Sequence, residues 1–120
     1  MDANEPKHRT KQFGLRVIRL VEALPTSRTA NVIGNQLLRA GTSVGANYRS
    51  ACRGRSKPDF ISKVGIAIEE ADEALYWMEM LIEAGLVSEE RPADLMNEGN
   101  ELVAILTASV KTARAHLARR

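Results

Sequence analysis

Residues 56–85, SKPDFISKVGIAIEEADEALYWMEMLIEAG, carry the pattern that decides the fold. Their apolar residues recur every three or four positions, which is the period of one face of an α-helix. This stripe comprises Phe60, Ile61, Val64, Ile68, Ala71, Leu75, Met78 and Ile82. Ser56 and Asp59 have the spacing of a capping box with Asp in place of Glu or Gln, and Gly85 offers a helix stop. The stretch predicts one amphipathic helix over residues 57–84.

Three further segments share this period, and they cover about residues 11–24, 30–53 and 90–118. Pro25 ends the first of them, because proline disfavours helical geometry in the residue before it. The polar residues before Lys11 are expected to form a tail. No run of alternating β-branched residues predicts a strand. The chain is therefore predicted to be all-α, a single domain over residues 1–120 that folds as an antiparallel up-down-up-down four-helix bundle.

The composition excludes several classes of protein. The chain has 120 residues and one cysteine, so no internal disulfide can form. Its longest apolar stretch without charge, residues 102–110, is nine residues long, whereas a membrane helix needs about 20. No apolar signal-peptide core precedes the helices. We therefore expect a cytoplasmic globular protein without a membrane partner.

The net charge of +2 hides a strong segregation. Residues 1–63 carry 12 basic and four acidic side chains, whereas residues 64–105 carry one basic and 11 acidic ones. Such blocks indicate partners or association rather than fold. Either the two segments face each other, within a chain or between subunits, or the basic segment meets an anionic partner.

The basic segment offers five candidate contacts for RNA or DNA. Arg39, Arg49 and Arg53 share one face of the predicted second helix, and Arg55 and Lys57 extend it into the following loop. Such a stripe can neutralise phosphates. Aromatic residues make up only 4% of the chain, so we expect backbone contacts to dominate base readout. The alternative is that these cations pair with the acidic third helix of a neighbouring subunit.

The third helix carries a second apolar cluster on the side opposite its core stripe. Ile66, Trp77, Met80 and Ala84 project within about 60° of one another there. A surface cluster with Trp and Met is typical of an interface, so we predict contact between subunits of a homo-oligomer. The alternative is that another helix of the same chain covers this face.

The second helix contains three glycines, Gly34, Gly41 and Gly45, and each costs about 1 kcal/mol of helix propensity relative to alanine. No phosphate-loop pattern accompanies them. A close approach by a neighbouring helix is the preferred explanation, which makes Gly41 and Gly45 structural residues.

Residues with catalytic or metal-binding potential are sparse. Cys52 lies on the apolar side of its helix without a histidine nearby, and His116 is predicted to be a helix-end cation. The acidic residues of the third helix point in several directions, and no Glu-x-x-His motif accompanies them. We therefore expect no enzyme, no cofactor, no metal and no small-molecule substrate.

The central segment resembles a known family. Gln36-Leu37-Leu38-Arg39-Ala40, Ser43-Val44, Asn47, Gly54-Arg55-Ser56 and Phe60 are similar to the four-helix-bundle proteins of the 23S ribosomal RNA intervening-sequence family. The resemblance implies a left-handed antiparallel bundle that assembles as a homopentamer, without an established enzymatic activity. Related accessory proteins of diversity-generating retroelements are similar bundles that associate with nucleic acid and a reverse transcriptase.

Arg39 and Asn47 match the family pattern. After Asn47 the family commonly continues Ile-Ala-Glu-Gly, whereas this chain has Tyr48-Arg49-Ser50-Ala51-Cys52-Arg53-Gly54, which loses an acid and gains two arginines. Asn47 lies at the edge of the apolar face, where its amide is expected to bond across helices in a structural role. Two functions remain open, a homo-oligomeric RNA- or DNA-binding accessory protein and an oligomeric scaffold or protein-interaction module without a nucleic-acid ligand.

Overall fold

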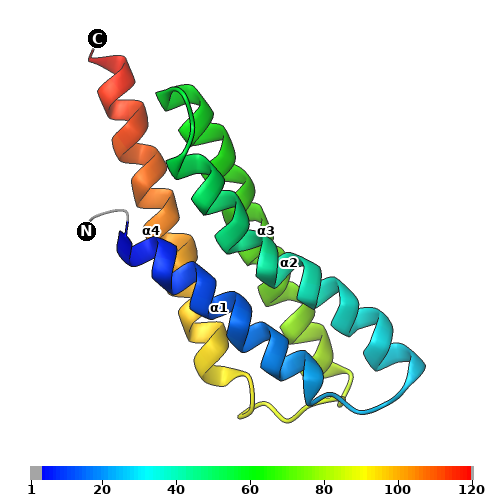
Figure 1. The fold of residues 1–120 in the computed structure, drawn as a ribbon. Helices are drawn as coiled ribbons and strands as arrows, with labels where there is room; N and C mark the ends of the chain where they lie inside the picture. The colour runs from blue at the N-terminus through cyan, green and yellow to red at the C-terminus, as the bar shows by residue number, and fades with distance from the viewer. Residues whose placement is uncertain (1–3, 120) are drawn as a thin grey trace.

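The computed structural model describes residues 4–119, which form four helices and no strand. They are α1 (Asn4–Glu22), α2 (Arg28–Cys52), α3 (Lys57–Glu83) and α4 (Ala93–Ala118). The chain reverses direction at each loop, so successive helices run antiparallel (Figure 1). Each helix packs against two others, α1 and α3 both contacting α2 and α4. The predicted all-α four-helix bundle is confirmed.

The helix ends follow local capping chemistry. The Oγ atoms of Ser27 and Ser56 accept hydrogen bonds from the backbone N–H groups three residues later, at 3.1 and 3.2 Å. Each serine thereby satisfies a donor that its helix leaves without an intrahelical partner. At the end of α3, Gly85 has a φ of 75°, and the N–H of Leu86 donates to the carbonyl of Leu81 at 2.9 Å. This is the Schellman arrangement that glycine permits.

Helix α1 begins at Asn4, seven residues before the predicted start, and the expectation of an N-terminal tail up to Lys11 is wrong. Pro6 occupies the first turn, where a missing N–H is harmless. The hydroxyl of the buried Thr10 donates to the carbonyl of Pro6 at 2.7 Å, so this polar side chain is satisfied inside the helix. Buried Pro6 and Thr10 extend the apolar stripe of Phe13 and Val17 back to the first turn.

The core face of α3 is broader than the predicted stripe. Val64, Ala67, Ala71, Ala74, Met78 and Leu81 are fully buried and alternate at three- and four-residue spacing. Ile61, Ile68 and Ile82, which belong to the predicted core stripe, are only half-buried. The reason is that α3 packs against both α2 and α4, so its apolar surface spans two neighbours.

Glycines set how closely α1 and α2 approach. A Cβ placed on Gly41 would lie 2.7 Å from both Cγ atoms of Val17, and one on Gly45 would lie 3.2 Å from the carbonyl of Thr10. By contrast, a Cβ on Gly65 in α3 would meet no atom within 4 Å. The backbones of α1 and α2 are therefore nearer to each other than helices with larger side chains allow.

Substitution of Gly41 and of Gly65 by alanine is expected to change the free energy of unfolding in opposite directions. Gly41→Ala should lower the free energy of unfolding by about 1–3 kcal/mol, because the stiff, fully buried Val17 cannot move aside. Gly65→Ala should raise it by about 0.5–1 kcal/mol through helix propensity alone. Urea denaturation followed by circular dichroism measures both. A Gly41→Ala protein as stable as Gly65→Ala would contradict the close packing.

Candidate nucleic-acid interface

The packing of α1 on α2 brings four cations to one groove. The backbone of Thr10 and Lys11 lies directly against Gly45. Because the helices are antiparallel, Lys7, one turn earlier on α1, is level with Arg49, one turn later on α2. We call this space of about 370 Å³ the basic groove; it is lined by Lys7, Thr10, Lys11, Gly14, Leu15, Ile18, Thr42, Gly45, Ala46, Arg49 and Arg53.

The positive charge of the basic groove is not compensated within the described part of the chain. Lys7, Lys11, Arg49 and Arg53 are all exposed. None of them has an ion-pair partner among residues 4–119, and no carboxylate is among the groove residues. Four solvated cations on adjoining helices attract an anionic ligand with several charges more strongly than one with a single charge.

Arg39 is placed differently from the other arginines of α2. Its guanidinium forms ion pairs with Glu70, at 2.9 Å, and with Glu73 of α3. The sequence left open whether the basic segment faces the acidic segment or an anionic partner. At Arg39 the basic and acidic segments face each other within one chain. Its charge is neutralised, and it does not line the basic groove.

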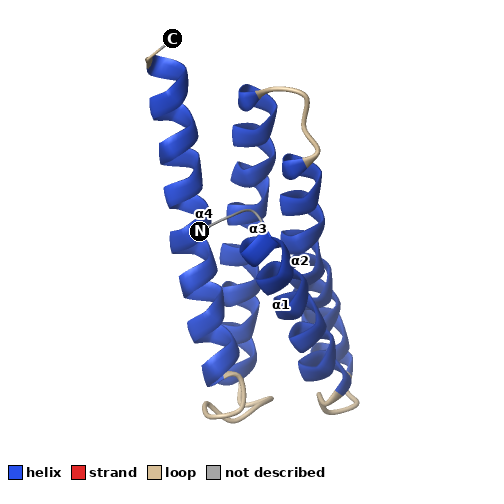
Figure 2. Ribbon diagram, turned by 60° about the vertical axis from the view of Figure 1, so that its left-hand side comes forward, coloured by secondary structure: helices blue, strands red, loops and turns tan. Residues whose placement is uncertain are grey.

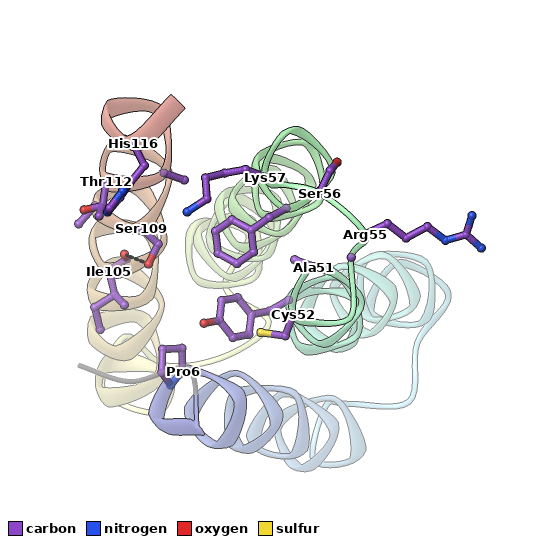
Figure 3. Close-up of a pocket in the computed structure, with 15 residues that line it drawn as sticks. Pro6, Ala51, Cys52, Arg55, Ser56, Lys57, Ile105, Ser109, Thr112 and His116 are labelled. Carbon is purple, nitrogen blue, oxygen red and sulfur yellow. Dashed lines mark hydrogen bonds between the residues drawn. The ribbon is translucent and has the colours of Figure 1, made fainter. Parts of the chain in front are cut away.

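Arg55 and Lys57 line a second, larger cavity at the end of the bundle where α2 turns into α3. Figure 3 shows Arg55 pointing away from this cavity into solvent, whereas Lys57 extends toward α4. The five cations predicted from the sequence are thus spread over three places. Only Arg49 and Arg53 lie in the basic groove.

Sequence reasoning did not select Lys7 and Lys11, because the predicted first helix began at Lys11 and left Lys7 in the tail. The signal was available in the spacing of Pro6, Thr10, Phe13 and Val17, which continues the three- and four-residue alternation of the helix back through the polar segment. A helix extended in this way puts Lys7 and Lys11 one turn apart on one face.

The remaining cation in this part of α1, Arg9, forms ion pairs with carboxylates of α4. Its Nε donates to Glu98 of α4 at 3.0 Å, and a second nitrogen contacts Glu101 at 3.3 Å. The hydrogen bond to Glu98 raises the pKa of Arg9 above its usual value, so the side chain stays charged. Arg9 ties α1 to α4 on the side away from the groove.

The predicted interface residues of α3 divide into exposed and half-buried ones. Ile66 and Met80 are 43% and 36% exposed, and Ala84 is also exposed. Trp77 is half-buried against the core rather than fully outward. Its indole Nε1 donates to Glu73 at 3.1 Å, and its ring meets that of Tyr76 edge-on at 5.1 Å.

Two further apolar residues belong to the same face. Tyr76 is 52% exposed and Val32 of α2 is 59% exposed. Since Arg39 lies opposite Glu70 and Glu73, antiparallel register places Val32, two turns before Arg39, level with Trp77 and Met80. We call this surface the α2–α3 outer face; it comprises Val32, Ile66, Tyr76, Trp77, Met80 and Ala84.

The amide of Asn47 does not bond across helices, so that expectation was wrong. Its Nδ2 donates to the carbonyl of Ser43 at 2.9 Å, one turn earlier in α2. A half-buried asparagine inside a helix reaches this carbonyl without any neighbouring chain, which satisfies its donor locally.

Two features are absent from residues 4–119. No three His, Cys, Asp or Glu side chains converge there as a metal site requires. In the same residues, no helix combines the length and the apolar character needed to cross a membrane.

Comparison with known proteins relates the chain to a protein family and to a solved structure. Residues 4–108 match the family described as 23S rRNA-intervening sequence protein. The fold is similar to the crystal structure of a protein with unknown function from the S23 ribosomal protein family of Bacteroides thetaiotaomicron. That protein is 35% identical, the match covers 88% of this chain and 98% of the other, and the TM-score is 0.83. No curated protein matches the chain.

Proposed function

The chain belongs to the family of 23S rRNA-intervening sequence proteins, and we propose that it is a non-enzymatic, homo-oligomeric bundle that binds the phosphate backbone of RNA or DNA. A solved relative is described as a protein with unknown function, so the proposal is argued from the surface of this chain. The observation that carries it is the basic groove, where two helices bring together four exposed cations without a carboxylate.

The spacing of these cations suits a polyanion. Lys7 and Lys11 are one turn apart on α1, and Arg49 and Arg53 are one turn apart on α2. Successive cations are therefore separated by about 5–6 Å along each helix, a spacing at which each can meet a different phosphate of one strand. The guanidinium groups can also bind phosphate oxygens in a bidentate manner. The groove has no aromatic lining, which favours backbone contacts over base readout.

The α2–α3 outer face supports the proposed assembly. Three of its apolar side chains, Val32, Ile66 and Tyr76, are more than 40% exposed, and Met80 is 36% exposed. Contact with further copies of this chain would remove this surface from water. The family resemblance implies a pentamer, and repeated grooves on one assembly would add avidity for a long polyanion.

The test is fluorescence anisotropy with a labelled RNA hairpin and a labelled DNA duplex at about 50 mM salt. We expect a Kd below about 1 μM for at least one of them, because the electrostatic contribution to affinity is large at low salt. Absence of binding to both would refute the proposal and favour a scaffold or protein-interaction module.

A further inference from the structure

A cavity larger than the basic groove lies where α1 stops short of the other helices. Helix α1 has 19 residues, whereas the others have 25 to 27, a difference of about 9–12 Å in length. At this end α4 faces the turn between α2 and α3 across space that α1 does not fill (Figure 2). The resulting cavity has a volume of about 780 Å³. Sites for small organic ligands commonly have volumes of about 300–1,000 Å³.

The lining of this cavity combines apolar and polar walls. Tyr48 and Phe60 contribute aromatic rings, and Ile105 and Ala108 of α4 add aliphatic surface. Farther along α4, Thr112 and His116 supply hydrogen-bonding groups, and Figure 3 shows Lys57 extending toward them from the start of α3. No carboxylate lines the cavity. A flat aromatic ring joined to an anionic group matches these walls.

The cavity and the basic groove are neighbours. Pro6 lines the cavity and Lys7 lines the groove, and the same holds for Cys52 and Arg53. In the first turn of α1 and in the last turn of α2, consecutive residues therefore line the cavity and the basic groove. Because successive helical residues point in different directions, a strand held by Arg53 in the groove reaches the cavity by turning around the ends of these helices.

We infer that this cavity accepts one unstacked nucleotide, at a strand end or a bulge, from a nucleic acid held in the basic groove. The base lies against Phe60 and Ile105, and Lys57 neutralises an adjacent phosphate. The inference rests on the proposed function and specifies its ligand, which is an end or a bulge in preference to continuous duplex. An unpaired base enters more readily than a paired one because no stacking or pairing has to be broken.

The experiment compares blunt hairpins with hairpins that carry a two-nucleotide 3′ overhang, made in both RNA and DNA, by fluorescence anisotropy. We expect the overhang to tighten binding at least about fivefold, the lower end of the effect of stacking one base on an aromatic side chain. The overhang carries 2-aminopurine, whose fluorescence should fall when the base packs in the cavity.

A variant that fills the cavity provides the control. Ala108→Trp places a large side chain in the cavity from an exposed position of α4, and Thr107→Trp places the same side chain on an exposed position outside the lining. Ala108→Trp should abolish the preference for the overhang while blunt hairpins bind as before, whereas Thr107→Trp should change neither. If Ala108→Trp does not fold, Phe60→Leu takes its place as the test. Phe60→Leu keeps the apolar volume without the aromatic ring, and it should reduce the preference for the overhang.

The outcomes separate the two proposals. Equal affinity for blunt and overhang hairpins would overturn the cavity inference and leave backbone binding in place. A preference for the overhang that persists unchanged in Ala108→Trp and Phe60→Leu would also overturn it. Absence of binding to every hairpin would overturn both proposals.

Discussion

Exchange of Lys7, Lys11, Arg49 and Arg53 for glutamine is expected to lower the affinity for duplex DNA by about 50,000-fold at 50 mM salt. Each phosphate that a cation neutralises contributes about −0.9 to the slope of log affinity against log salt concentration. At 50 mM salt, each such contact therefore raises the affinity about fifteenfold relative to 1 M salt. Four such contacts in one groove multiply to the expected loss. Anisotropy titration of the variant should therefore reach no measurable binding at micromolar protein.

A charge-matched variant distinguishes the groove from net charge. Arg19, Arg28, Lys111 and Arg114 are exposed cations outside the basic groove, and their exchange for glutamine removes the same total charge. This control should retain most of the affinity, since it keeps the converging cations. Equal losses in the two variants would show that net charge, and not the groove, governs binding. Circular dichroism verifies that both variants are folded.

Introduction of two glutamates on the α2–α3 outer face is expected to dissociate the assembly. Ile66→Glu with Met80→Glu would place carboxylates in a contact that excludes water, where an unpaired charge is strongly unfavourable. Both positions are exposed in the single chain, so the bundle itself should stay folded. Light scattering should give an oligomeric mass for the wild type and the mass of one chain for the variant, with unchanged helical content.

The matched control uses the two large apolar side chains of residues 4–119 that are exposed outside this face. Leu15 and Ile18 are 37% and 36% exposed on α1, and they lie away from the α2–α3 outer face. Leu15→Glu with Ile18→Glu should leave the oligomeric mass unchanged. Trp77 is a poorer choice, because it packs on the core and its substitution would also disturb the fold. A wild-type protein that scatters as a single chain would rule out the assembly.

The bundle could be predicted from the sequence because helical periodicity is a local property. The stripe through Val64, Ala71 and Met78 indicates a helix without reference to any other part of the chain. The Ser56 cap and the Gly85 stop are equally local signals, and the structure shows both residues in these positions.

The candidate site could be predicted only in part, because it depends on contacts between helices. The glycines of α2 signalled close packing, but their sequence does not say which helix approaches or which side chains it brings. Lys7 joins Arg49 through the register of α1 on Gly45, and Arg39 is neutralised by Glu70, 31 residues later. Helical spacing within α2 alone therefore grouped Arg39, whose charge is paired, with Arg49 and Arg53, whose charges are not paired among residues 4–119.

The salt dependence of binding tests the central claim most directly. One groove that neutralises four phosphates of duplex DNA should give a slope of about −3.6 in log affinity against log salt. Arg49→Gln with Arg53→Gln should halve the slope of the wild type, whatever the number of grooves that one duplex engages. A slope that is the same in the wild type and in this variant would contradict the basic groove as the nucleic-acid site.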